Sequence, residues 1–246
     1  IPRRSAVLTF DDGLKDHYRV VFPILKKLGL PAAFFPISRS VREEILTIAH
    51  KNHFLFHSFP IPELRKIIHQ EIPRHLRDIE KSEGYAIAAR TRYRFDNQDT
   101  AALKYFVNHC LPDNVRKLVI ARVFKKAFPN ENEIAREFYL SEPEIQEMSG
   151  AGFEFGSHSH NHFVLAHASP RLQERELRLS KNYVERLIKK PVATLSYPFG
   201  HIGEFNETTI SIAKKLGFRA GLANIHKINK GRVDPFSIAR IDAVLV

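Results

Sequence analysis

The sequence has few of the residues that build covalently cross-linked or membrane-embedded proteins. Its 246 residues include no tryptophan, one methionine and a single cysteine, Cys110. One cysteine excludes an intramolecular disulfide framework and is typical of a reducing compartment. No stretch approaches the roughly eighteen apolar residues of a membrane-spanning helix, and no secretory leader is visible. These absences favour a cytoplasmic location, although the chain does not begin with Met and a trimmed N-terminus stays an open alternative.

The chain is strongly basic, with a formal net charge of +11 at pH 7. Its lysines and arginines are spread along the sequence and form no long block, and it has no Cys/His finger or aromatic RNA-binding signature. Nucleic acid is therefore not an expected partner. A basic surface suits acidic substrates, such as phosphate-bearing sugar carriers, or serves solubility alone. Nothing in the sequence defines an oligomeric state.

Two adjacent carboxylates follow an apolar run near the N-terminus. Ala6-Val7-Leu8 leads into Thr9-Phe10-Asp11-Asp12-Gly13, where the glycine gives the backbone the freedom to turn. A pair of carboxylates at the end of a buried strand is unfavourable unless positive charge lies beside it. A divalent metal is the simplest species that would stabilise the pair, and ordinary turn chemistry is the alternative.

A histidine cluster further along the chain favours the metal interpretation. The segment 156–162 contains His158, His160 and His162 directly after the apolar Phe155. His158 and His162 are four residues apart, so a helix starting here would place both on one face, with His160 pointing elsewhere. Two imidazoles and one carboxylate form a common metal-binding set that leaves positions open for water and substrate. A solvated histidine-rich loop is the alternative.

Three motifs occur in a fixed order along the chain. They are Thr9-Phe10-Asp11-Asp12-Gly13, His158-Ser159-x-x-His162 and Ser196-Tyr197-Pro198-Phe199-Gly200. Together they resemble the ordered motifs of the polysaccharide deacetylases, a family also called carbohydrate esterase family 4 or the NodB homology domain. The flanking segments 23–35 and 139–156 are similar to the same family, and the resemblance covers about residues 5–38 and 138–242.

The resemblance implies roles for the residues of the first two motifs. By this similarity Asp12, His158 and His162 bind a divalent metal, and Asp11 is the general base. Zinc suits two imidazoles and a carboxylate, and the same set admits cobalt, nickel or iron. Such a metal would acidify water and polarise an acetyl carbonyl while the neighbouring carboxylate takes the proton.

The third motif is implied to stabilise the oxyanion. In the family, the backbone N–H of the residue after the motif's proline stabilises the tetrahedral oxyanion, and that residue corresponds to Phe199. Tyr197 and Phe199 are expected to line the acetyl pocket and contact substrate. Pro198 is expected to fix the shape of this substrate-binding loop.

The chain departs from the family at the partner of the base. Many members carry an arginine at the start of the third motif that pairs with the base, where this chain has Leu195 and Ser196. We expect Arg240 to replace that arginine beside Asp11 and to lower the pKa of the Asp11 carboxyl. A surface or ion-pair arginine is the alternative.

A second departure concerns the proton that the departing amine needs. The Leu-x-His motif that often supplies this proton is missing from the end of the chain. His160, His201 and His226 are available, but none matches the family motif. Return of the proton from Asp11, acting first as base and then as acid, is the favoured alternative.

Strand-like and helix-like segments alternate in the two regions that contain the motifs. Strands are expected at 7–10, 32–36, 194–197 and 219–223, and helices at 18–28, at 207–216 and from Ser169 onward. This alternation favours an α/β protein with parallel strands. The resemblance implies a distorted, incomplete (β/α) barrel with its site at the carboxyl ends of the strands.

Residues 41–137 interrupt this alternation with mainly helical patterns. Apolar residues recur every three or four positions between Ile61 and Ile79, and Pro73 predicts a kink or two shorter helices there. We expect a helical insertion, 41–137, within a single catalytic domain that spans residues 1–246. It would form a lid, a substrate wall or a dimer surface, or only elaborate the packing.

The sequence thus predicts a metal-dependent hydrolase that removes the N-acetyl group from an amino sugar in a glycan or glycan precursor. Its expected partner is an N-acetylated carbohydrate substrate. A related C–N hydrolase acting on a formamide or another non-peptide amide would use the same residues. A non-catalytic sugar-binding or metal-binding relic is a third alternative, which the missing Leu-x-His motif keeps open.

Overall fold

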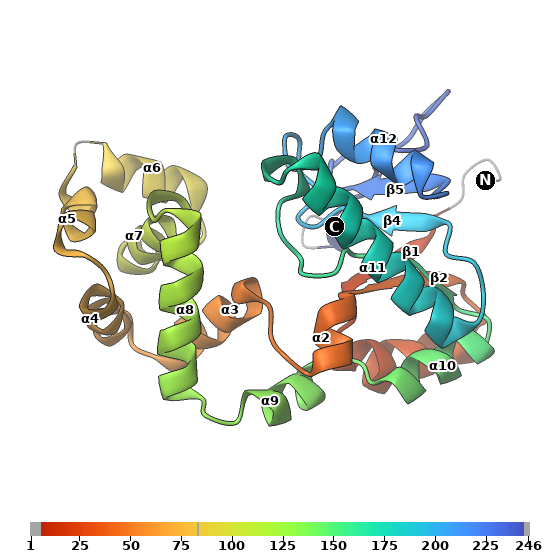
Figure 1. Ribbon diagram of the computed structural model, residues 1–246, viewed down its shortest axis with the longest axis horizontal. Coiled ribbons are helices and arrows are strands. Elements are labelled where there is room, and N and C mark those ends of the chain that lie inside the picture. The colour runs from red at the N-terminus through yellow and green to blue at the C-terminus, as the bar shows by residue number, and fades with distance from the viewer. Residues whose placement is uncertain (1–5, 83, 244–246) are drawn as a thin grey trace. The chain divides into compact units, whose positions relative to one another are not determined.

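The computed structural model describes residues 6–82 and 84–243, which divide into two compact units (Figure 1). The first unit consists of the chain up to Ile45 and from Asn132 onward, and the second is Leu46–Glu131. Across the described residues, no helix combines the length and the hydrophobicity needed to cross a lipid bilayer.

Among the described residues, six parallel strands form the centre of the first unit. One sheet has the order β1 (Leu8–Asp12), β2 (Ala32–Pro36), β3 (Glu154–Phe155), and the other has the order β4 (Thr194–Ser196), β5 (Ala220–Ala223), β6 (Ile238–Ala239). Ser157 joins the two sheets, because it forms a parallel bridge with Leu195 just beyond the end of β3. Within the described residues β1 and β6 share no ladder. The predicted α/β class and the incomplete barrel are therefore confirmed.

Aromatic residues fill the space around the first strands. Phe34 and Phe35 are fully buried, and Phe34 lies opposite Phe10 in the β1–β2 register. The rings of Phe10 and Phe34 stack at 5.0 Å, and Phe155 stacks on the other side of Phe34 at 5.7 Å. A strand as apolar as β2 is typical of a parallel sheet covered on both faces.

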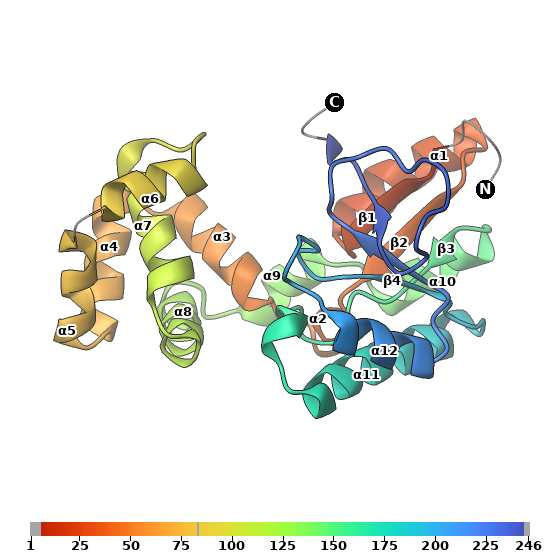
Figure 2. The ribbon, with the colours of Figure 1, turned by 90° about the horizontal axis from the view of Figure 1, so that it is seen from above.

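Helices connect the strands of the first unit, as Figure 2 shows for α1 beside β1 and β2. They are α1 (Phe22–Leu28), α2 (Ser38–Glu43), α9 (Glu131–Phe138), α10 (Glu142–Gly150), the short 3₁₀ turn Leu165–His167, α11 (Pro170–Ile188) and α12 (Glu207–Lys215). The helix predicted at 18–28 is in fact a π-helical turn, His17–Val21, followed by α1. It ends where Gly29 adopts a φ of 64°, a conformation that favours glycine at a helix end.

The longest helix, α11, begins as the sequence predicts. The side chain of Ser169 accepts a hydrogen bond from the N–H of Leu172, and Pro170 occupies the first turn. Leu177 and Val184 are fully buried in the core. The helix packs against both α10 and α12.

In the second unit, all the regular secondary structure of the described residues is helical. It contains α3 (Ile48–Ser58), α4 (Ile61–Glu71), α5 (Arg74–Arg77), the 3₁₀ turn Asp78–Lys81, α6 (Tyr85–Arg92), α7 (Gln98–Tyr105), the π-helical turn Phe106–Cys110 and α8 (Asp113–Ala127). Pro73 separates α4 from α5, so the predicted interruption produces two helices. The unit has a core of its own, in which Leu55, Leu64, Phe106 and Phe124 are fully buried.

Candidate active site

The two adjacent carboxylates lie at the carboxyl end of β1, where the backbone turns sharply. Asp12 and Gly13 have φ angles of 69° and 71°. A Cβ atom on Gly13 would lie 2.8 Å from the Cβ of Pro36, at the end of the neighbouring strand β2. Glycine is therefore required here both for its conformation and for its size.

The histidine motif forms a loop and not a helix, so the helical face considered for His158 and His162 is not what brings them together. Ser159 and His162 have φ angles of 60° and 55°, in the left-handed region that residues other than glycine rarely adopt. The N–H of His162 donates to the hydroxyl of Ser159 at 3.0 Å and closes the loop. A tight loop thus brings together the two imidazoles that a helix was expected to align.

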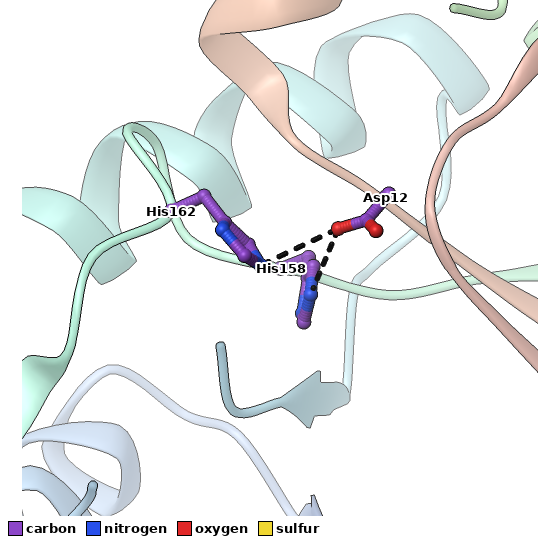
Figure 3. Close-up of side chains that lie close together, drawn as sticks. All are labelled: Asp12, His158 and His162. Atoms are coloured by element: carbon purple, nitrogen blue, oxygen red, sulfur yellow. Dashed lines mark ion pairs between the residues drawn. The ribbon is translucent and has the colours of Figure 1, made fainter. Parts of the chain in front are cut away.

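Asp12 faces both imidazoles (Figure 3). Its Oδ1 lies 3.4 Å from Nε2 of His158 and 3.3 Å from Nε2 of His162. One ligand atom from each residue lies within 4.8 Å of the others, so these three side chains can hold one metal ion. His160 is not part of the group, because its Nδ1 lies 2.9 Å from the hydroxyl of Ser38.

The tautomer of His158 suits metal binding. Its Nδ1 lies 2.8 Å from the carbonyl oxygen of Ser196, which can only accept a hydrogen bond, so the proton belongs on Nδ1. In the neutral ring the lone pair is then on Nε2, the atom that faces Asp12. A ligating histidine is commonly oriented by such a bond on its other nitrogen.

Charge in the site also favours a cation. Burial is the largest influence on the pKa of His158 and lowers it, but Asp11, Asp12 and the Ser196 carbonyl together outweigh burial and raise this pKa above its ordinary value. The two carboxylates therefore attract positive charge to this position, either a proton or a metal ion. The donor set and its charge both fit a divalent metal.

Asp11 has a separate set of partners. Its Oδ1 accepts from Nη1 of Arg240 at 2.9 Å, and its Oδ2 accepts from Nη2 of Arg240 at 2.7 Å and from the hydroxyl of Ser196 at 3.0 Å. Burial, the largest influence, raises the pKa of Asp11. The charge of His158 and the bonds from Arg240 outweigh burial and hold this pKa below its ordinary value. Asp11 is thus kept ionised next to the metal-binding group.

The third motif forms the loop after β4. Phe199 has a φ of 61°, its side chain is 40% exposed, and its ring lies 4.7 Å from that of His162. The loop is closely packed at its end, because a Cβ on Gly200 would lie 2.8 Å from the backbone N of Asn224. Pro198 and Phe199 thus present a short, rigid segment beside His162.

Tyr197 has a different environment from the one its motif suggested. Its side chain is fully buried, stacks on Phe205 at 4.0 Å and donates a hydrogen bond to the carbonyl of Phe236 at 3.0 Å. The ring therefore supports the loop from within the core and offers no open face to a ligand.

Ser196 is the site residue that sequence reasoning missed. From sequence it was named only as the first residue of the third motif, where relatives carry an arginine, and was given no role, yet its hydroxyl contacts Asp11 and its carbonyl contacts His158. The one sequence signal was its place directly before the Tyr-Pro-Phe-Gly turn. Of the other histidines considered, His226 accepts a weak hydrogen bond from the N–H of Asp242 at 3.4 Å.

Comparison with known proteins identifies the family. The polysaccharide deacetylase family model matches residues 1–105 and 119–221. The chain belongs to the polysaccharide deacetylase family. It is 29% identical over 219 residues to the putative polysaccharide deacetylase YxkH of Bacillus subtilis (strain 168), a match that covers 89% of this chain and 44% of that protein. The chain therefore spans less than half the length of this curated relative.

Solved structures of polysaccharide deacetylases share the fold. The Streptococcus pyogenes deacetylase PplD, in complex with acetate, has a TM-score of 0.56 and 20% identity, covering 98% of this chain and 66% of that chain. The BpsB deacetylase domain from Bordetella bronchiseptica has a TM-score of 0.56 and 15% identity, covering 98% and 72%. IcaB from Ammonifex degensii has a TM-score of 0.55 and 17% identity, covering 98% and 68%. The predicted family and its type of barrel are thereby confirmed.

Proposed function

We propose that this polysaccharide deacetylase family member is a metal-dependent hydrolase that removes the N-acetyl group from an amino sugar in a glycan or glycan precursor. The observation that carries the proposal is that two adjacent carboxylates have different partners. Asp12 faces the imidazoles of His158 and His162, whereas Asp11 is bound by Arg240. One carboxylate is thereby available as a ligand and the other as a base.

Asp12, His158 and His162 would hold the metal, for which zinc is the best match and cobalt, nickel or iron are alternatives. When bound, a divalent cation supplies Lewis acidity, which lowers the pKa of water and polarises a carbonyl. The Ser196 carbonyl keeps the proton of His158 on Nδ1, so that its Nε2 remains free to ligate.

Asp11 acts as the general base and removes a proton from the attacking water. Arg240 favours the ionised carboxylate that a base requires, and it acts as a positioning residue for Asp11. Oδ1 of Asp11 accepts one hydrogen bond, so it retains a lone pair for the incoming proton. Return of that proton from Asp11 to the departing amine completes the reaction with one residue as base and acid.

By its resemblance to the family motif, the backbone N–H of Phe199 is the group that stabilises the oxyanion. The half-exposed ring of Phe199 contacts the substrate beside His162. Pro198 contributes the fixed shape of the loop, and Tyr197 contributes to binding only through its buried support of that loop.

We also propose that residues 41–137 are an insertion in one catalytic domain. The chain leaves the first unit after Ile45 and returns at Asn132, and both parts are needed to complete the series β1 to β6. These boundaries support an insertion within one α/β unit, with limits a few residues inside 41–137 at each end.

Acetate release from a panel of N-acetylated amino sugars tests the function. The purified protein is assayed after chelation and after addition of zinc or cobalt, with Asp11→Asn as the control that keeps all three ligands. We expect metal-dependent release that falls by about 10²–10⁴-fold in this variant. A panel of N-formylated sugars tests the alternative substrate class. Bound metal with no turnover on either panel would favour a binding relic.

A further inference from the structure

A buried carboxylate outside the metal-binding group contacts the loop between its two histidines. Glu176, on α11, is 1% exposed. Its Oε2 accepts from the backbone N–H groups of His160 and Asn161 at 3.1 and 2.7 Å, and its Oε1 accepts from the side-chain amide of Asn161 at 2.5 Å. These three hydrogen bonds all come from the residues between His158 and His162.

The opposite side of the loop is bound by α2. The N–H groups of Ser38 and Arg39 donate to the carbonyls of Ser159 and His160 at 3.4 and 3.1 Å. The guanidinium of Arg39 donates to the side-chain oxygen of Asn161 at 2.8 Å. Two N–H groups of the loop are therefore bound by Glu176, and two of its carbonyl groups are bound by α2.

The loop conformation explains why it needs such support. Ser159 and His162 both adopt left-handed backbone angles, which are unfavourable for side chains of their type and persist only when the surroundings impose them. A buried carboxylate is also unfavourable unless several donors surround it. The strained loop and the buried carboxylate stabilise each other. The left-handed backbone directs the N–H groups of His160 and Asn161 at Glu176, and Glu176 holds the loop in that conformation.

The position of Glu176 is itself well fixed. Ser180, one turn further along α11, is fully buried and shares a hydrogen bond of 2.9 Å with Ser157, directly before His158. The same face of the helix thus contacts the chain before the first histidine and the loop after it. The 19-residue helix α11 therefore restrains the backbone on both sides of His158.

We propose that Glu176 is a positioning residue that sets the separation of His158 and His162 and thereby the affinity of the site for a divalent metal. The inference rests on the proposed role of the two histidines as ligands. Without the carboxylate the loop relaxes from its left-handed conformation, and the two Nε2 atoms no longer converge. Loss of a group that orients metal ligands typically weakens metal binding by about 10–100-fold.

The test compares Glu176→Gln with Glu185→Gln. Glu185 is a matched control, because it also lies on α11 and also accepts from a backbone N–H, that of Val192 at 2.9 Å. Zinc affinity is measured by chelator competition, and cobalt is used as a spectroscopic probe of ligand geometry. We expect Glu176→Gln to lose about 10–100-fold in zinc affinity with an altered cobalt spectrum, and Glu185→Gln to behave as the wild type.

Wild-type zinc affinity and an unchanged cobalt spectrum in folded Glu176→Gln would overturn the proposal. If that variant does not fold, Asn161→Ala takes its place, since it removes one donor to Glu176 and leaves the carboxylate buried. A loss of at least about threefold in zinc affinity supports the proposal, by analogy with partial loss of ligand orientation, and no loss overturns it.

Amide hydrogen exchange tests the role of Glu176 without depending on metal binding or on activity. In the metal-free protein, the amides of His160 and Asn161 should exchange faster in Glu176→Gln than in Glu185→Gln. If the wild type binds no metal, the proposed function fails, while faster exchange still supports the contact of Glu176 with the loop. Equal exchange in the two variants would exclude any positioning role.

Discussion

Arg240 and Asp11 form two parallel hydrogen bonds, of 2.9 and 2.7 Å, although 229 residues separate them in the chain. Such a bidentate arrangement is specific to the planar guanidinium group. It joins the end of β6 to the end of β1, two strands that share no ladder in the described part of the chain. This contact between the ends of the first and last strands therefore also helps to keep the proposed base ionised.

Replacing Arg240 should shift the pH dependence of the reaction. Because Arg240 lowers the pKa of Asp11, Arg240→Ala should raise that pKa, and the acidic limb of kcat/KM should move to higher pH by about one unit or more. Arg240→Lys keeps the charge and loses the bidentate geometry, so it should shift the limb less. An unchanged pH profile in Arg240→Ala would show that Arg240 has no influence on the base.

His17 should make stability fall in mild acid. Burial lowers its pKa to about 4, against the attraction of Asp12, Asp11 and Asp16. Its ring packs against Phe10 at 5.4 Å, and its Nδ1 has no hydrogen-bond partner among the described residues. In the unfolded chain His17 binds a proton more tightly than in the folded protein. The contribution of neutral His17 to the free energy of unfolding is therefore fully present above pH 6.5 and is lost as pH falls toward 4. By pH 5 the loss is about 2 kcal/mol.

Denaturant unfolding of metal-free protein at pH 7 and pH 5 checks this value. His17→Phe keeps an aromatic ring at this site and removes the titrating group. The free energy of unfolding should fall by about 2 kcal/mol less between the two pH values in the variant than in the wild type. The same decrease in both proteins would contradict a neutral, buried His17.

Gly13 should be far less tolerant of alanine than Gly29. Both have left-handed φ angles, 71° and 64°, but a Cβ on Gly29 would meet nothing within 4 Å, whereas one on Gly13 would lie 2.8 Å from Pro36. Gly29→Ala should cost about 1–2 kcal/mol for conformation alone. Gly13→Ala should cost clearly more in denaturant unfolding, because the overlap adds to the strain. Equal costs would show that the turn can move away from Pro36.

Variants of Phe199 and Tyr197 should have different effects, because Phe199 is proposed to contact the substrate and Tyr197 to support the loop. Phe199→Ala keeps the backbone N–H and should raise KM about tenfold, since part of the ~1.5–3 kcal/mol of a buried aromatic ring is lost. Tyr197→Phe removes the bond to Phe236 and should cost about 1 kcal/mol in stability with KM unchanged. Steady-state kinetics and thermal unfolding of the two variants check this, and the reverse pattern would place Tyr197 in the pocket.

Local sequence signals predicted β1, β2, β4 and β5 and the ends of several helices. Pro73 separates two helices, Gly29 ends α1 and Ser169 begins α11, because each acts through the backbone of its immediate neighbours. The condition that a helix begins at His158 was not met for a related reason. The left-handed angles at Ser159 and His162 are imposed by distant contacts, which local propensity does not include.

The polar contacts within the core could not be predicted from sequence. A glutamate on a long charged helix is usually solvated, so Glu176 gave no sign of its burial. Ser196 contacts Asp11 and His158 through a hydroxyl and a carbonyl, and a serine before a turn has no pattern that signals this. Both depend on chain segments that meet only in the folded molecule.

The contact between the first and last strands has a consequence for synthesis of the chain. The three candidate ligands, Asp12, His158 and His162, have all left the ribosome well before β6 and Arg240 follow. The proposed ligands are therefore synthesised before the guanidinium group that binds Asp11. On this arrangement, the ionised state of the proposed base would be the last feature of the site to be secured, because Arg240 is its final partner to be synthesised.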